Sequence, residues 1–313
     1  MLFRSSLIIA HHPLLFSGLK KITGSNYVER IVLKAIKHDV AIYAMHTNLD
    51  NMPLGVNYKI ARRLGLEQER ILDPKQGLLF KLVCYVPIAA IESVKNALFA
   101  IGAGNIGDYA ECSFMCLGTG SFRPGVASQP LIGTAGGPRE NVEEYRLELI
   151  IPGHLRRQAL ATLRQVHPYE EVAYEMLAIE NEWQHLGAGM IGELKQALPL
   201  ADCLKLVKET LKVACIRHTK PHKEMIQKIA VCGGSGSFLL SAAKAAGADM
   251  FITADMKYHQ FFDAEDQIII ADIGHFESEQ FTIEIFSEIL KKKFPNFALL
   301  FTEVNTNPLN YYF

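Results

Sequence analysis

Residues 228–253, KIAVCGGSGSFLLSAAKAAGADMFIT, contain the clearest evidence for the fold class. The apolar run at 228–232 has the length of a buried strand, and a glycine-rich loop at 233–236 follows it. Residues 238–246 have a helical pattern, and a second apolar run follows at 250–253. A strand, a helix and a strand in this order predict an α/β fold with neighbouring parallel strands.

The same alternation extends along the chain on both sides of this stretch. Toward the N-terminus we expect two strands and two helices, at 7–10, 41–45, 27–36 and 60–64. Toward the C-terminus we expect a strand, a long helix and a final strand, at 267–271, 276–293 and 298–303. The two flanks therefore predict one α/β core made of two halves, with mainly parallel sheets.

A different pattern interrupts this core. The run LFKLVCYVP at 79–87 is an apolar strand that ends in proline and precedes an amphipathic helix. RLELIIP at 146–152 repeats this arrangement before a second helix. Two such units predict an inserted ferredoxin-like α+β domain. We expect three segments: the first part of the core at 1–77, the insert at 78–182 and the second part of the core at 183–313.

The composition excludes several classes of function. Lys and Arg number 32 against 33 Asp and Glu, for a net charge of −1, which argues against nucleic acid as the main ligand. No apolar run reaches the roughly 18 residues of a membrane-spanning helix. The six cysteines include no CxxC pair and are expected to be reduced thiols. These features predict a cytoplasmic protein without a membrane partner.

Histidines and carboxylates follow three of the expected strands. His11 and His12 follow the strand at 7–10, Asp50 lies shortly after the strand at 41–45, and His275 and Glu279 follow the strand at 267–271. The carboxyl ends of strands in an open α/β sheet line the crevice where ligands bind. His275 and Glu279 are four residues apart, so a helix would place them on one face.

Three imidazoles and two carboxylates that converge can hold two divalent ions with open positions for water. Nitrogen and oxygen donors without thiolate favour zinc, manganese or iron. His46 and His259 also follow expected strands and are candidates for proton transfer. His46 has an alternative role in orienting a ligand, and His259 has the alternative of a helix-surface residue. The GGSGS loop at 233–237 is interpreted as a tight turn.

Several of these motifs together resemble the Nif-three-like dinuclear-metal proteins, which are also called GTP cyclohydrolase I type 2 homologues. The core motifs that carry the resemblance are IIAHHPLLF, AMHTNLD, GGSGS, ITADMKYH and DIGHFESE. The middle segment is similar to the PII- and CutA-like insert of longer members, on the motifs GAGNIGDYAECSF, GTGSFRPG and HPYEEVAYE. Relative to the family core, an N-terminal portion before the first of these motifs is expected to be missing.

The resemblance implies a two-metal site on His11, His12, Asp50, His275 and Glu279, the set that the strand-end argument also reaches. It further implies a homo-oligomer, a hexamer, and metal-activated water acting on a nucleotide-like small molecule. A hydrolase is therefore the first hypothesis. The alternative is a non-catalytic metal-binding or regulatory protein whose PII-like insert senses a small ligand.

Overall fold

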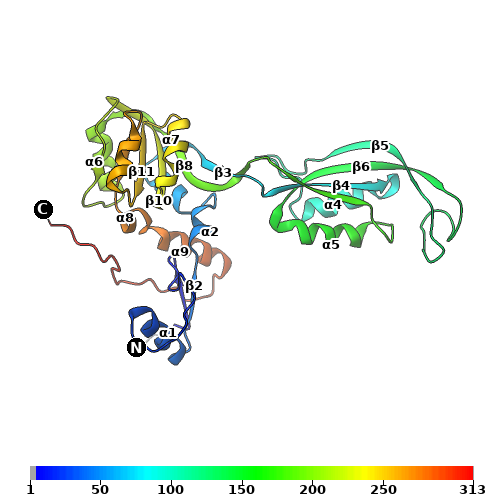
Figure 1. Cartoon of the computed structure of the whole chain (residues 1–313), viewed down its shortest axis with the longest axis horizontal. Coiled ribbons are helices and arrows are strands. Elements are labelled where there is room, and N and C mark those ends of the chain that lie inside the picture. The colour runs from blue at the N-terminus through cyan, green and yellow to red at the C-terminus, as the bar shows by residue number, and fades with distance from the viewer. Residues whose placement is uncertain (1–4, 313) are drawn as a thin grey trace. The chain divides into compact units, whose positions relative to one another are not determined.

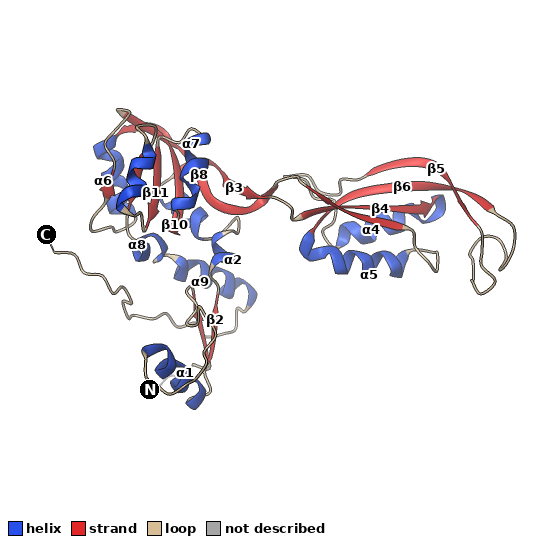
Figure 2. Cartoon of the chain, viewed as in Figure 1, coloured by secondary structure: helices blue, strands red, loops and turns tan. Residues whose placement is uncertain are grey.

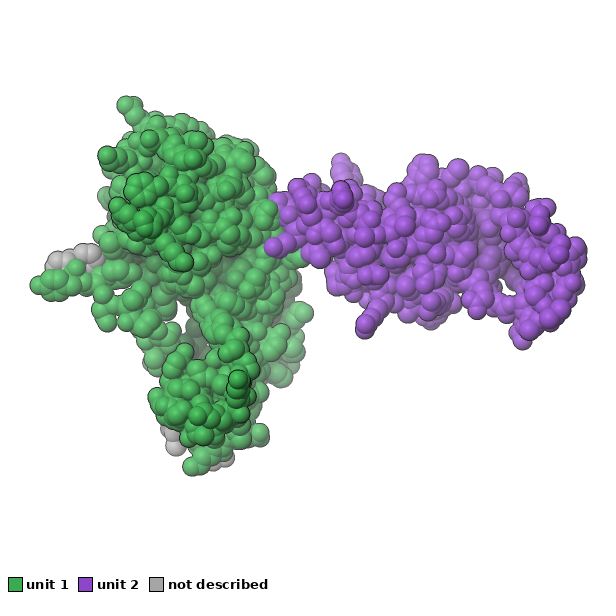
Figure 3. Space-filling view, viewed as in Figure 1, with its two compact units in different colours: residues 1–73, 185–313 green, residues 74–184 purple. Residues whose placement is uncertain are grey.

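The computed structural model describes residues 5–312, which form two compact units (Figures 1 and 3). Unit 1 combines Met1–Asp73 with His185–Phe313, and unit 2 is Pro74–Gln184. None of the helices among the described residues has the length and apolar character that crossing a bilayer requires.

The strands form three sheets (Figure 2). In chain order they are β1 (Leu7–Ala10), β2 (Ala41–Ala44), β3 (Leu66–Lys75), β4 (Leu79–Pro87), β5 (Phe114–Phe122), β6 (Glu140–Pro152), β7 (Tyr174–Ile179), β8 (Trp183–Pro199), β9 (Arg217–His218), β10 (Met225–Ser235), β11 (Met250–Ala254) and β12 (Ile269–Asp272). The main α-helices are α1 (Tyr27–Lys37), α2 (Thr47–Asp50), α3 (Val56–Arg63), α4 (Ile91–Ala100), α5 (Arg156–Val166), α6 (Leu200–Thr210), α7 (Leu240–Ala245), α8 (His275–Glu279) and α9 (Thr282–Lys293).

The expectation of mainly parallel sheets in the core is wrong, because its six-stranded sheet is mixed and only the small β1-β2 sheet is wholly parallel. Unit 1 contains a six-stranded sheet in the order β3-β8-β10-β11-β12-β9. Its centre, β10-β11-β12, is parallel as predicted, but β8 pairs with β10 and β9 pairs with β12 in antiparallel fashion. Buried strands of either direction have similar apolar runs, so the apolar pattern alone does not determine strand direction.

Alternate residues of β10 pack on opposite faces of this sheet. Ile229 and Val231 belong to a core shared with α3, α6 and α9, whereas Ala230 and Cys232 belong to a core shared with α7. This alternation follows from the two-residue period of a strand. The six-stranded sheet is therefore covered by helices on both faces, and its strand ends support the loops described below.

The two expected strands near the N-terminus form a separate sheet in unit 1. β1 and β2 pair in parallel, with Leu7 opposite Ala41 and Ala10 opposite Ala44. Asn26 caps the N-terminus of α1, and its side chain accepts a hydrogen bond from the backbone N–H of Glu29. This parallel register brings the carboxyl ends of β1 and β2 to the same edge.

Unit 2 has the element order β4-α4-β5-β6-α5-β7 and one antiparallel sheet in the order β5-β6-β4-β7. Leu82, Cys84 and Val86 alternate along β4 and are fully buried in a core shared with α4 and α5. The intervening side chains of β4 lie on the other face of the sheet. On that face, Tyr85 of β4 lines a cavity together with the segments that follow β5 and α5.

Two predicted elements near the C-terminus differ from the structure. Residues 298–303 are not a strand, although their apolar pattern suggests one. The long helix expected at 276–293 is divided into α8 and α9 at Gln280 and Phe281. A strand needs a partner for its backbone groups, and the described residues provide none at 298–303.

Candidate metal centre

Two adjacent histidines follow β1. The Nδ1 atom of His11 lies 2.9 Å from the carbonyl oxygen of Met45, which can only accept, so Nδ1 carries the proton. The Nε2 atom of His11 is then the ring nitrogen that faces Asp50 and Glu279, on a side chain only 7% exposed. His12 is more open, with a side chain 45% exposed. The turn after β1 lets both rings face the same edge.

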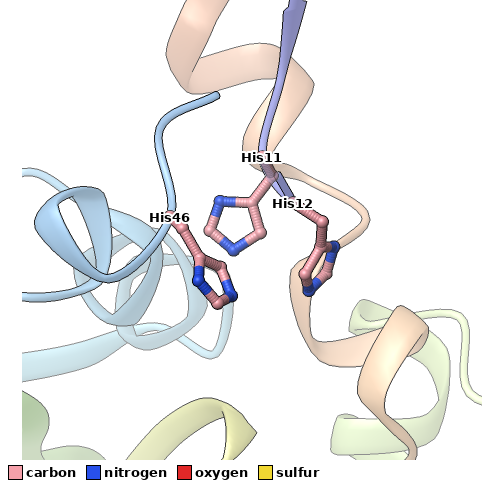
Figure 4. Close-up of side chains that lie close together, drawn as sticks. All are labelled: His11, His12 and His46. Atoms are coloured by element: carbon pink, nitrogen blue, oxygen red, sulfur yellow. The ribbon is translucent and has the colours of Figure 1, made fainter. Parts of the chain in front are cut away.

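The segment after β2 adds two further groups. His46 precedes α2, and its ring centroid lies 5.4 Å from that of His11 and 5.0 Å from that of His12 (Figure 4). Asp50 ends α2 and places Oδ1 3.5 Å from Nε2 of His11. Leu49, which is buried in the core of unit 1, anchors this helix beneath the site.

α8 brings the remaining two residues from a distant part of the chain. His275 and Glu279 lie one helical turn apart, with His275 Nε2 3.2 Å from Glu279 Oε2. The same oxygen lies 3.5 Å from Nε2 of His11 and 3.3 Å from Nε2 of His12. One carboxylate oxygen therefore faces three imidazoles, and the Nε2 atoms of His12 and His275 are 3.2 Å apart.

The donor atoms at the centre of this cluster fit a metal ion. His11 Nε2, Asp50 Oδ1 and Glu279 Oε2 are buried and have no hydrogen-bond partner within the described part of the chain. Buried polar atoms normally have such partners, and a bound cation would satisfy all three. Three overlapping groups have donor atoms within 4.8 Å of one another: His11–His12–His46, His12–His275–Glu279 and His11–Asp50–Glu279.

The pKa values of the two carboxyl groups in the cluster are shifted in opposite directions. Burial opposes ionisation of Glu279, but the contacts with His11 and His275 outweigh it and lower the pKa of Glu279 to about 2. Burial raises the pKa of Asp50 to about 6, although the charge of His11 opposes this. Glu279 is thus the permanent negative charge of the cluster.

Burial and contact with charged neighbours also change the pKa values of the histidines. Contact with Glu279 raises the pKa of His275 to about 9, against the effect of burial and with the help of Asp255. Burial lowers the pKa of His12 and of His46. Neutral imidazole is the form that binds metal, so these two rings are already in the ligating form at neutral pH.

Residues outside the predicted set support the cluster. Asp255 follows β11 and holds Nδ1 of His275 at 2.6 Å from its Oδ2. Gly234 has a φ of +63°, and a Cβ atom there would collide with Oε1 of Glu279. Ser278 accepts the Gly234 N–H at 2.8 Å, and Asn57 accepts the Gly233 N–H at 2.8 Å. The glycine-rich segment therefore lines the centre. Its residues 233–235 continue β10 up to Ser235, so the turn expected at 233–237 is wrong for this part of the motif.

The structure separates the two proton-transfer candidates. His46 lies beside His11 and His12, whereas His259 is exposed in the 3₁₀ helix η4 (Tyr258–Ala264) and contacts the ring of Tyr258. Asp255 was missed, although it belongs to the ITAD run at 252–255 and lies two residues after the strand predicted at 250–253. The position after a strand was the available signal for Asp255.

The fold and this cluster define a class: a mixed α/β protein with grouped histidines and carboxylates that could hold metal. Comparison with family models identifies the class further, because the model of the Duf34/NIF3 family (NGG1p interacting factor 3) matches residues 3–308. The chain belongs to this family.

Curated relatives and a solved structure agree with this assignment. The chain is 38% identical over 312 residues to the "GTP cyclohydrolase 1 type 2 homolog" of Halalkalibacterium halodurans, covering 98% of this chain and 84% of the relative. It is 37% identical over 311 residues to the protein of the same name in Bacillus subtilis, covering 97% and 83%. The crystal structure of a Bacillus cereus protein related to NIF3 superposes with a TM-score of 0.83, at 37% identity and coverage of 98% and 83%.

Proposed function

We propose that this protein binds two divalent metal ions and is a metal-dependent hydrolase. The observation that carries the proposal is the set of three buried donor atoms, His11 Nε2, Asp50 Oδ1 and Glu279 Oε2, which have no hydrogen-bond partner in the described chain. Leaving such groups unsatisfied is costly, and a cation would offset that cost. The open side of His12 supports a centre that water and a substrate can reach.

The five predicted residues would hold the ions between them. His11 with Asp50 and His12 with His275 would bind one ion each, and Glu279, which faces both histidine groups, would bridge. Nitrogen and oxygen donors suit zinc, manganese or iron. When bound, such ions lower the pKa of water and make it a nucleophile at neutral pH. Glu279 and Asp50 would hold this water by accepting its hydrogen bonds.

Among the residues of the chain, His46 is the better placed group to move a proton. Its ring lies beside His11 and His12. Of the three potential metal-binding groups, His46 belongs only to the one that has no carboxylate. A neutral imidazole at that position can accept a proton from water. His259 would need to act from its exposed position in η4. The substrate class is a nucleotide-like small molecule, supported by the names of the relatives.

Metal content tests the proposal directly. Elemental mass spectrometry should find about two ions per chain in the wild-type protein after reconstitution with zinc or manganese. His12→Ala and Glu279→Ala should each lower this content, whereas His259→Ala, which removes a histidine distant from the cluster, should retain it. GTP and other nucleotides would then be assayed for hydrolysis. Wild-type protein that binds no metal, or equal metal content in all variants, contradicts the site.

The second candidate function is a non-catalytic metal-binding or regulatory protein. It is favoured by the organisation of unit 2, whose β4-α4-β5-β6-α5-β7 order supports a ferredoxin-like, PII/CutA-like domain. A cytoplasmic homohexamer is proposed with either function. Size-exclusion chromatography with light scattering measures the hexamer, and metal loading without nucleotide turnover would favour the regulatory function.

A further inference from the structure

Unit 2 contains a cavity that the metal centre does not involve. Its volume is about 490 Å³, within the range of small-molecule sites. The strand β5, its following loop and the segment after α5 form the walls. The aromatic side chains of the lining are Tyr85, Phe122 and Tyr169. The charged side chains of the lining are Arg123, Glu144, Glu170 and Glu171. Three carboxylates against one guanidinium make the lining acidic.

A buried carboxylate forms the polar floor of this cavity. Glu144 on β6 is only 9% exposed, and its Oε1 accepts a hydrogen bond of 2.7 Å from the hydroxyl of Tyr169. No described residue donates a hydrogen bond to Oε2, and no Lys or Arg forms an ion pair with this carboxylate among residues 5–312. Oε2 is not one of the fully buried atoms without a partner, so it is open to the cavity, where a charge shielded from bulk water attracts a counter-charge more strongly than at the surface. A positively charged group in the cavity would supply the missing partner.

Gly120 and His167 keep the floor and walls in place. A Cβ atom at Gly120 would collide with Oε2 of Glu144, so a larger residue there would displace the carboxylate from its present position. His167 is buried, and its Nδ1 accepts the backbone N–H of Tyr169 at 3.1 Å while Nε2 donates to the carbonyl of Tyr85 at 3.0 Å. This pair of bonds orders the segment that carries Tyr169. The motifs GTGSFRPG and HPYEE thus combine in one site.

We propose that the cavity of unit 2 binds a small organic cation, an amine or guanidine on an apolar body. The cationic group would lie against Oε2 of Glu144, and the body would contact Phe122, Tyr85 and Tyr169. Aromatic faces attract cations and also bury apolar groups. The carboxylate of Glu170 already has a hydrogen-bond partner, because its Oε1 accepts the Gln129 N–H at 2.9 Å. Glu144 therefore provides the specificity.

Three probes that share an indolyl-ethyl body test the charge preference on the full chain by isothermal titration calorimetry. They are tryptamine, a cation, tryptophol, its neutral analogue, and indole-3-propionate, an anion. Wild-type protein should bind tryptamine at least ten-fold more tightly than tryptophol and should bind the anion most weakly. Equal affinity for the three probes, a preference for the anion, or no binding of tryptamine at millimolar concentration would overturn the proposal.

Variants of the carboxylates show which residue of the cavity causes the preference for tryptamine. Glu144→Gln keeps an acceptor for Tyr169 but removes the charge, so the preference for tryptamine over tryptophol should fall from at least ten-fold to the few fold that the other carboxylates of the lining supply. Glu171→Gln changes an exposed lining residue that folding does not require, and it should weaken tryptamine binding by a few fold. Glu92→Gln on the exposed side of α4 is the matched control and should leave binding unchanged. An undiminished preference for tryptamine in Glu144→Gln contradicts the assignment.

The test is independent of the metal centre. His12→Ala lies in unit 1, and its binding of tryptamine should equal that of the wild-type chain. A wild-type chain that binds tryptamine but no metal would contradict the hydrolase proposal alone, and one that binds metal but not tryptamine would contradict the cavity proposal alone. Loss of cation preference in His12→Ala would contradict a site built by unit 2 alone.

Discussion

Asp255 and His275 form a carboxylate–imidazole pair in which Oδ2 of Asp255 lies 2.6 Å from Nδ1 of His275. The other nitrogen of the same ring, Nε2, faces Glu279 at 3.2 Å. A carboxylate in this position keeps the proton on Nδ1, so Nε2 is the ring nitrogen that faces the cluster and would bind a metal ion. Asp255 therefore orients His275 through its hydrogen bond and adds negative charge behind the ring.

Replacement of Asp255 by asparagine should weaken metal binding. The loss of a carboxylate that orients a metal-binding histidine typically costs roughly 10- to 100-fold in affinity, and we expect a zinc dissociation constant raised by that factor. Competition with a chromogenic chelator measures it. Asp266→Asn is the matched control, because Asp266 also has a left-handed backbone, with φ of 54° against 57° for Asp255. Equal zinc affinity in the two variants would show that Asp255 has no orienting role.

The cluster was predictable from the sequence because its residues follow strand ends. His11, Asp50 and His275 are far apart in the chain, but each follows a strand that a short apolar run predicts. The carboxyl ends of parallel strands meet at one edge, which accounts for the contact between His11 and Asp50 after β1 and β2. His275 follows β12 in the other sheet of unit 1, so its approach to them depends on how the two sheets pack. Asp255 obeys the same rule and was predictable on the same evidence.

The parts that could not be predicted depend on contacts that local patterns do not encode. β8 is a strand of 17 residues that pairs antiparallel with β10, and an apolar run does not specify the direction of its neighbour. The collision that a side chain at Gly234 would have with Glu279 likewise depends on α8, which lies about forty residues further along the chain. The direction of strands and the approach of glycine to a side chain require the three-dimensional structure.

The start of α1 should be sensitive to acid. The carboxylate of Glu29 accepts hydrogen bonds from the hydroxyl and the backbone N–H of Thr23, both at 2.8 Å, and from Ser25 and Asn26. The hydrogen bond from the Thr23 side chain is the largest of the effects that lower the pKa of Glu29 to about 2, from an ordinary value of 4.5. A lowered pKa in the folded state means that this stabilisation is present above pH 4.5 and is lost as the pH falls toward 2.

An NMR titration of the Glu29 carboxyl carbon checks this prediction. The midpoint should lie near 2, and the resonances of α1 should change over the same pH interval. Glu29→Gln should remove that transition from α1. A midpoint at or above 4.5 in the wild-type chain would mean that the hydrogen bonds from Thr23 do not stabilise the ionised form.

The cysteines should differ widely in reactivity. Burial raises the pKa of Cys232 to about 12, with further effects from Asp50 and Glu279, and burial raises the pKa of Cys84 to about 12. Cys116 on β5 is exposed. At pH 8 a thiol with a pKa of 12 is ionised in about one molecule in 10⁴, so iodoacetamide should modify Cys116 and leave Cys232 and Cys84 intact. Peptide mapping by mass spectrometry measures the three sites. All three should react in guanidinium chloride, and modification of Cys232 in the folded chain would contradict its burial.

A methyl group at Gly234 should disturb the metal centre more than the fold. Gly234 has a φ of +63° and its added Cβ would collide with Oε1 of Glu279, whereas Gly247 has a φ of +70° and nothing within 4 Å of an added Cβ. Alanine at either position therefore has a similar backbone cost of about 1–2 kcal/mol, which lowers the melting temperature of both variants. Only Gly234→Ala should also lower the number of zinc ions retained after dialysis, because Glu279 must move. Thermal melting and metal content measured together separate the two effects. If Gly247→Ala loses as much metal as Gly234→Ala, the loss comes from the backbone and the contact between Gly234 and Glu279 does not shape the centre.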